Sequence, residues 1–408
     1  MRRYAQVLAF LLVLGAFPIA PFAEATVETP VDREVAENTA FALQLYQKLC
    51  DATGNLFLSP FSISTALAMT YAGARGNTAR EMAEALHFSL EGEELHSAFA
   101  DLKKNLLEVE RKGGVRLTVA NALWPQRGYP FLREYLALVE RYYGTTVTPM
   151  DYAKAAEQAR QTINEWVDRE TEHKIKNLIP AGILNPLTRL VLTNGIYFKG
   201  DWASQFKKSA THDEPFQTIP GSSIKVPMMT QQHRFRYGER DDFQVLELPY
   251  VGDDLSLVVL LPRRVEGLPE LERALTPEGL ADWTGHLRER EVVVFLPRFT
   301  LTSQFRVDAA LKALGLGDAF SPEKADFSGM DGMPHWLYIG AVLHKAFVIV
   351  NEEGTEAAAA TGVVVGVTSV AVRPPTFRAD HPFLFLIRAN RTGSILFMGR
   401  VVDPTREG

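Results

Sequence analysis

The sequence predicts an α+β protein built as one large domain. Helix-forming segments dominate its first half and strands its second, an order typical of mixed α+β packing. The chain has 408 residues, 46% hydrophobic and 23% charged, as is ordinary for a soluble globular protein. This length fits one large domain or two modest ones. No repeat, low-complexity tract or linker divides the chain, so we expect a single domain.

Helices are expected where apolar residues recur at helical spacing. The segment 61–73 is apolar on all sides, which predicts a helix buried all round. Asn77 and Thr78 are candidate caps for the next helix, which runs to about Leu86. The remaining helices are expected over 31–51, 93–112, 131–143, 152–173, 268–275 and 277–287.

Strands are expected from β-branched and alternating apolar runs. They cover 55–60, 115–124, 145–150, 189–199, 224–237, 243–250, 255–261, 292–299, 337–350, 381–388 and 394–401. Asn194 lies in the middle of the buried run 189–199. A polar side chain there must find a partner or cost about 1–3 kcal/mol.

The first residues have the pattern of a signal peptide. Arg2 and Arg3 precede an apolar core over 7–17, and Ala23-Glu24-Ala25 offers small residues to a signal peptidase. We expect cleavage after Ala25, a mature domain over 26–408, and secretion to an extracellular or periplasmic space. The alternative is a single membrane anchor, although the apolar run is short for a span.

Composition and charge exclude several classes of function. The net charge of −6 argues against wholesale binding to nucleic acid, whose phosphates need a basic face. The single cysteine, Cys50, excludes an intramolecular disulfide and a cysteine-based zinc site. Basic residues within 93–112 allow either a polyanion site or a plain solvated face, and interleaved acids favour the latter.

Motifs of catalysis are missing from the sequence. It contains no Gly-x-Ser-x-Gly elbow, no His-Glu-x-x-His and no P-loop, and the nine histidines show no metal-ligand spacing. The run Gly315-Leu-Gly317 lacks the third glycine of a dinucleotide loop. We therefore expect neither an enzyme nor a bound cofactor or metal.

The segment 351–361, NEEGTEAAAAT, is the most unusual of the chain. Its small residues can cross a tight interior, and the β-branched run that follows suits an extended backbone. In an extended conformation Thr355, Ala357, Ala359 and Thr361 share one face, and Glu356 faces the other way. An ordinary strand followed by an Ala-rich helical turn is the alternative reading.

Four blocks in order resemble the serpin family, in its inhibitory form. They are NLFLSPFSISTALAMTYAGARGNTAREM, LTNGIYFKGDWASQF, the segment EEGTEAAAAT, and ADHPFLFLIR with SILFMGRVVDP. The resemblance covers essentially the whole mature chain. It implies a single-domain fold with three β-sheets, about eight or nine helices and an exposed reactive loop.

The resemblance also implies a mechanism, suicide inhibition of serine proteases. The protease cuts a bait bond in the loop 354–377 and forms an acyl-enzyme through its own serine. The cut loop then inserts into the main sheet as a new strand and traps the protease. The hinge of this loop corresponds to Glu352, Glu353, Gly354, Thr355, Glu356, Ala357, Ala358, Ala359, Ala360 and Thr361.

The bait bond is placed by counting about sixteen residues beyond Glu352, as the family pattern implies. This gives Thr368-Ser369, with Val367 or Val370 as alternatives. Small, β-branched flanks suit an elastase- or subtilisin-type protease, whereas trypsin-like targets prefer Arg or Lys. The resemblance also leaves a cysteine protease open as the target.

The resemblance assigns two further groups of residues. Ser59, Ser62, Asn194 and His344 match a buried polar cluster that gates the opening of the sheet, although each also fits a satisfied core polar group. Trp202 matches the tryptophan where the loop enters, or it is a plain core aromatic.

Alternatives from other classes remain open at the sequence level. A non-inhibitory relative that acts as a carrier or chaperone is the first, and an enzyme or cell-envelope binding protein is the second. We expect a monomer with a tendency to polymerise and no stable membrane association after signal cleavage. Asn390 begins a formal glycosylation sequon.

Overall fold

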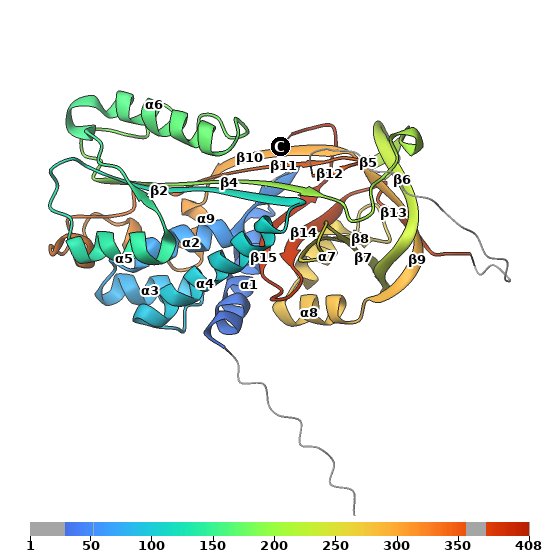
Figure 1. The fold of residues 1–408 in the computed structure, drawn as a ribbon, viewed down its shortest axis with the longest axis horizontal. Helices are drawn as coiled ribbons and strands as arrows, with labels where there is room; N and C mark the ends of the chain where they lie inside the picture. Colours follow the sequence, from blue (N-terminus) through green and yellow to red (C-terminus); the bar gives the residue numbers. More distant parts are fainter. Residues whose placement is uncertain (1–28, 52, 356–372, 408) are drawn as a thin grey trace, which may run out of the picture.

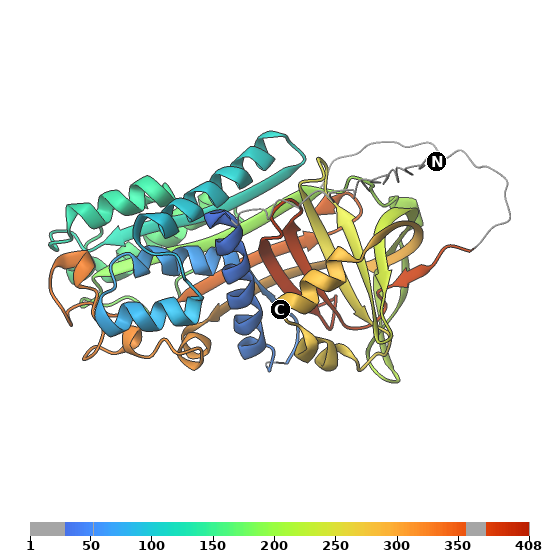
Figure 2. The same cartoon turned by 90° about the horizontal axis from the view of Figure 1, so that it is seen from below.

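Two β-sheets and a group of helices make up the structure, a computed structural model that describes residues 29–51, 53–355 and 373–407. One sheet forms a long layer with α6 on one face and α2 to α5 on the other (Figure 1). The second sheet lies at the other end of the molecule, beside α1, α7 and α8 (Figure 2). No helix in these ranges is long and apolar enough to cross a membrane.

The first sheet has six strands in the order β10-β11-β4-β2-β3, with β12 paired to β4. These strands are β2 (Val115–Pro125), β3 (Thr146–Val147), β4 (Leu190–Asp201), β10 (Phe299–Arg306), β11 (Leu343–Val350) and β12 (Gly354–Thr355). It contains the predicted strand with Asn194 in its middle, and it carries the candidate site.

The second sheet has nine strands in the order β1-β15-β14-β8-β7-β6-β9-β13, with β5 paired to β6. They are β1 (Leu56–Leu58), β5 (His212–Ile219), β6 (Ser222–Glu239), β7 (Phe243–Pro249), β8 (Leu255–Pro262), β9 (Arg288–Pro297), β13 (Thr376–Arg378), β14 (Phe383–Ala389) and β15 (Ile395–Val401). The long β6 pairs with β5 and β9 and also with β7. β6 thus connects β5, β9 and β13 with β7 and the strands beyond it. For this reason the described strands form two sheets, whereas three were expected.

Ten α-helices are present in the described part of the chain, against the expected eight or nine. They are α1 (Pro30–Leu49), α2 (Pro60–Tyr71), α3 (Gly76–Leu86), α4 (Gly92–Arg111), α5 (Arg133–Tyr143), α6 (Tyr152–Glu170), α7 (Leu268–Ala274), α8 (Pro277–Gly285), α9 (Asp308–Ala313) and α10 (Ser328–Asp331). The two that the sequence did not predict, α9 and α10, span only six and four residues. Such short segments carry no readable helical period.

The fully apolar helix α2 is confirmed and is central to the packing. Its N-cap Ser59 accepts a hydrogen bond from the Ser62 N–H, and Pro60 occupies the first turn, where a missing N–H costs nothing. Most of its residues are buried, and it packs against β4 and β15. The helix therefore fixes Ser59 and Ser62 directly beneath the six-stranded sheet.

Three local predictions were wrong. The run 337–350 is a strand only from Leu343, and 337–342 is irregular. Asn77 and Thr78 do not cap α3: its N-cap is Arg75, and the Thr78 hydroxyl accepts a bond from the Asp326 N–H instead. The strands β5 and β10 and the short β12 and β13 were missed.

Candidate functional site

The candidate site lies along β4, because this strand is paired unequally on its two sides. On one side its whole length pairs with β2, from Val115↔Gly200 to Pro125↔Leu190. On the other side only Gly195–Tyr197 pairs with β11, in parallel, at residues 345–347. The described residues leave the rest of this edge unpaired up to β12. An unpaired central edge is a position for an additional strand.

A tight turn connects β11 to β12 at the C-terminal end of β4. The Asn351 side-chain oxygen accepts hydrogen bonds from the N–H groups of Glu353 and Gly354, at 3.1 and 3.2 Å. Gly354 has φ +148°, and a Cβ there would lie 2.1 Å from the Gly200 carbonyl oxygen. Glycine is thus required for β12 to reach β4.

Trp202 anchors this turn from below. Its indole Nε1 donates to the Asn351 carbonyl at 2.9 Å, and its backbone N–H donates to the Glu353 carbonyl at 3.0 Å. The ring is buried and stacks on Tyr250, with centroids 4.7 Å apart. Trp202 therefore lies where the chain leaves the sheet, and its role at the entry of the loop stays a prediction.

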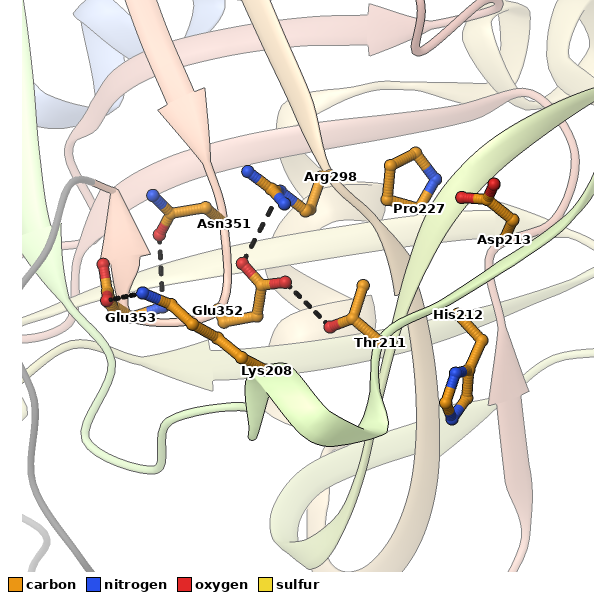
Figure 3. A pocket seen from close by; sticks show the side chains of 9 residues that line it. All are labelled: Lys208, Thr211, His212, Asp213, Pro227, Arg298, Asn351, Glu352 and Glu353. Carbon is orange, nitrogen blue, oxygen red and sulfur yellow. Dashed lines mark hydrogen bonds and ion pairs between the residues drawn. The ribbon is translucent and has the colours of Figure 1, made fainter.

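Glu352 is buried at the same end of the sheet, with two partners for its carboxylate (Figure 3). The Thr211 hydroxyl donates to Oε1 at 2.8 Å, and the Arg298 Nε lies 3.5 Å from Oε2. Buried charge is tolerated only when it is paired in this way. The shallow pocket around these groups has a volume of about 530 Å³.

Glu353 pairs with the exposed Lys208, at 2.6 Å between Nζ and Oε1 (Figure 3). The hydrogen bond that Lys208 donates to Glu353 raises the pKa of Lys208, and the negative charge of Glu353 acts in the same direction. The two glutamates of the hinge thus differ in exposure, because the side chain of Glu352 is 5% exposed and that of Glu353 is 14% exposed.

A buried polar cluster occupies the middle of β4. The Asn194 Nδ2 donates to the carbonyl and the hydroxyl of Ser62, at 2.7 and 2.6 Å, and the His344 Nδ1 lies 3.2 Å from the Asn194 Oδ1. The Ser59 backbone N–H donates to the His344 Nε2 at 3.1 Å, and its hydroxyl donates to the Leu396 carbonyl. All four side chains are buried, so α2, β4, β11 and β15 are joined at one point.

The electrostatics of the cluster keep His344 neutral. Burial lowers the pKa of His344 to about 3. Since Nε2 accepts the Ser59 N–H, the ring proton resides on Nδ1 and is donated to Asn194. This single tautomer satisfies both ring nitrogens.

The structure places nine of the predicted site residues in two groups along β4. The hinge residues Glu352 to Thr355 lie at its C-terminal end with Trp202, and the polar cluster lies at its middle. The hinge residues Glu356 to Thr361 and the bait positions Val367, Thr368, Ser369 and Val370 lie outside the described residues. The roles assigned to them remain predictions.

Several contacts at the site were not predicted. The hinge is held by side chains of Asn351, Thr211, Arg298 and Lys208. In the polar cluster, the Asn194 Nδ2 also donates to the Asn121 Oδ1 at 3.0 Å. The Asn-x-x-Gly pattern of 351–354 is typical of a side-chain-stabilised turn and would have identified Asn351. No sequence signal connects Arg298 with Glu352, which are far apart in the chain.

Comparisons with known proteins agree with this arrangement. The family model "Serpin (serine protease inhibitor)" matches residues 36–404. The leukocyte elastase inhibitor of Homo sapiens is 44% identical over 379 residues, which cover 90% of this chain and 98% of that protein. Leukocyte elastase inhibitor A of Mus musculus is 44% identical over 380 residues, with the same coverage. The crystal structure of human thyroxine-binding globulin superposes with a TM-score of 0.82 at 31% identity, covering 93% of this chain and all of that one. The chain therefore belongs to the serpin family.

Proposed function

We propose that the protein is a suicide-substrate inhibitor of serine proteases that traps its target by loop insertion. The observation that carries the proposal is the register of β12 on β4. Gly354 lies opposite Asp201 and Thr355 opposite Gly200, in an antiparallel ladder that begins at the unpaired edge of β4. An inserting loop continues this ladder towards the polar cluster.

The residue types of the loop fit that register. Continuing it brings Ala357 opposite Phe198, Ala359 opposite Ile196 and Thr361 opposite Asn194. Residues directly opposite in an antiparallel pair share a face of the sheet. Phe198, Ile196 and Asn194 are buried, so small side chains are required opposite them. The two alanines and Thr361 meet that requirement, and Thr361 brings a hydroxyl to the polar cluster.

Insertion is energetically plausible. Roughly ten new backbone pairings at about 0.5–1.5 kcal/mol each, with side-chain burial, stabilise the inserted form by on the order of 10 kcal/mol. The native state is then held by a barrier, so its stability is kinetic. The three-residue ladder between β4 and β11 is a small barrier to their separation compared with the full ladder on the other side.

The proposed target is an elastase- or subtilisin-type protease. It would cut this chain at the bond Thr368-Ser369. The small, β-branched flanks of this bond support a shallow primary pocket in the protease. The relatives named leukocyte elastase inhibitor support the same class. A cysteine protease is a further proposed partner.

We also propose that the chain is cleaved after Ala25 and that residues 26–408 are secreted. The secreted protein is proposed to be a monomer that tends to polymerise.

A panel of proteases tests the proposal. The mature protein is incubated with elastase, subtilisin, trypsin and papain, and we expect a detergent-stable band of combined mass with elastase or subtilisin. Mass spectrometry of the released peptide identifies the bait bond, and cleavage after Arg373 would contradict the assignment.

The melting temperature of cleaved protein tests loop insertion. A protein cut within 363–373 should melt at a higher temperature than the intact protein, because the freed loop inserts. An equal melting temperature would refute the mechanism.

A carrier function is the second candidate, supported by the similarity to thyroxine-binding globulin. The hinge discriminates between the two, because carrier-type relatives have charged, bulky or proline residues where this chain has 357–361. A carrier should show no rise in melting temperature when its loop is cut.

A further inference from the structure

A cavity of about 460 Å³ lies at the N-terminal end of β4, away from the hinge. Its walls come from α2, from the connection 178–189, from the first residues of β4 and from the irregular segment 336–342. It occupies the part of the β4 edge that β11 does not pair, because β11 begins only at Leu343. The size is that of a small-molecule site.

The interior of the cavity is apolar and incompletely filled. Leu190, Val191 and Leu192 line it and are only half-buried, although the neighbouring residues of β4 are buried. Six large hydrophobic side chains are exposed in the described part of the chain, and three of them, Leu187, Trp336 and Tyr338, line this cavity. A concentration of exposed apolar groups at a concave site marks a binding surface.

The charged groups at the cavity have one sign. Its only charged lining residues are Arg189 and Arg306, and no acidic side chain lines it. Arg306 is already paired with Asp308, 2.7 Å from Nε to Oδ2. Arg189 donates from Nη1 to the carbonyls of Pro186 and Thr188 and forms no ion pair with any described residue. The guanidinium also lies over the Tyr129 ring, 5.9 Å from its centroid, but this contact uses the face of the group and leaves Nε and Nη2 as in-plane donors for an anion.

We propose that this cavity binds an amphipathic carboxylate, with its aliphatic or aromatic body between β4 and the 336–342 segment and its carboxylate on Arg189. Charge complementarity and the apolar walls select this class over a neutral apolar ligand or a polyanion. Burial of the body supplies most of the affinity, and Arg189 supplies the orientation.

The position of the cavity gives the ligand a regulatory effect, and this part rests on the proposed function. Continuing the β12 register brings Val363 opposite Leu192 and Val365 opposite Leu190, so the inserting loop needs the same space. A bound carboxylate therefore competes with the last steps of insertion. With the ligand bound, a larger fraction of the inhibitor is cleaved as an ordinary substrate, and the protease is released active.

Calorimetric titration of the intact protein with decanoate tests the binding, with decanol as the neutral analogue. We expect the parent to bind one decanoate saturably. The affinity should fall about tenfold in Arg189→Gln, which loses one charge-assisted hydrogen bond. Arg189→Lys keeps such a bond and should keep the affinity. Ala341→Trp, which fills the cavity, should abolish binding while the melting temperature stays near that of the parent. Arg127→Gln, an exposed arginine outside the cavity, is the matched control and should bind normally.

Two results would overturn the site: no saturable binding of decanoate, or equal affinities for Arg189→Gln and the parent. The regulatory part is measured separately, as the moles of protein consumed per mole of protease inactivated. This ratio should rise with decanoate in the parent and not in Arg189→Gln. Binding with an unchanged ratio refutes the competition. A protein that inhibits no protease even without decanoate refutes the proposed function and leaves the binding result standing.

Discussion

His344 on β11 and Asn194 on β4 are joined across the centre of the six-stranded sheet, 3.2 Å from Nδ1 to Oδ1. The contact lies next to the three residue pairs of the backbone ladder between these strands, which join Gly195–Tyr197 of β4 to residues 345–347 of β11. Because the surrounding edge of β4 is unpaired in the described structure, a side-chain bond takes over the role that ladder bonds have elsewhere in the sheet.

Replacing Asn194 with alanine should weaken this connection and lower the free energy of unfolding by about 2–3 kcal/mol. The change leaves buried groups of His344 and Ser62 without a partner, and each such group costs about 1–3 kcal/mol. Thermal unfolding of Asn194→Ala measures the loss. Gln158→Ala, at an exposed position of α6, is the control and should be neutral. Equal melting temperatures for both variants would contradict a structural role for the contact.

Mild acid should destabilise the protein through His344. Its pKa is about 3 in the folded state, against an ordinary value of 6.5, so the unfolded chain binds a proton that the native state refuses. Stability attributable to this group is complete above pH 6.5 and falls by about 1.4 kcal/mol per pH unit down to pH 3. Urea unfolding between pH 7 and pH 4 measures the slope.

His344→Gln should make this slope shallower, whereas the exposed His286→Gln should not. His96, whose pKa burial lowers to about 4, adds to the slope in all of these variants and does not affect the comparison. An unchanged slope in His344→Gln would show that its neutrality is not what stabilises the native state.

Glu34 on α1 should be a site where a substitution stabilises the protein. Its carboxyl is fully buried without a hydrogen-bond partner in the described structure, and burial raises its pKa to about 9. The native state therefore keeps a proton that the unfolded chain loses above pH 4.5, and stability falls as the pH rises from 4.5 to 9. Glu34→Leu should gain on the order of 2–3 kcal/mol at pH 7.5 and little at pH 4.5. Glu94→Leu, at an exposed position, is the control.

The sequence predicted the fold well where burial follows periodicity. The helix α2 and the strand β4 are both apolar runs of the right length, and the structure buries most of both. β10 was missed because a single residue, Arg298, separates it from β9, and the strand predicted over 292–299 ended at the first residue of β10. Residues 337–342 were assigned to a strand because they are apolar, but Tyr338 is exposed at the cavity. Hydrophobicity does not distinguish a core position from a binding surface.

The candidate site could be predicted only in part. The polar cluster and Trp202 were found because a family resemblance marks them and because a buried Asn194 demands a partner. Thr211 and Arg298 were not found, since they reach Glu352 from distant parts of the sequence that only the folded chain brings together. The cavity at Arg189 was equally invisible, because it results from the absence of pairing between β4 and the segment that precedes β11.

Glu352→Lys should loosen the hinge. The lysine places a second cation beside Arg298 at a buried position. It also removes the carboxylate that accepts the hydrogen bond from the Thr211 hydroxyl. Arg298 is half-exposed, which weakens the pair, so we expect a loss of about 1–2 kcal/mol and faster polymerisation on warming. Melting curves and size-exclusion chromatography measure both effects. The double variant Glu352→Lys with Arg298→Glu restores opposite charges and should recover part of the stability; no recovery would show that the pair does not matter.

Thr355→Arg should convert the inhibitor into a substrate. In the proposed insertion, which continues the β12 register, Thr355 would be the first residue whose side chain shares the inner face with Ala357 and Ala359. A guanidinium there must be buried without a partner, which costs several kcal/mol and slows insertion below the rate of deacylation. The protease should therefore cut the loop and leave, and the detergent-stable complex should disappear while the cleavage product accumulates. Glu356→Arg is the matched control, because in an inserted strand that side chain would face the opposite way and its charge could remain solvated. An unchanged yield of complex in Thr355→Arg, or an equal loss in both variants, would contradict insertion in this register.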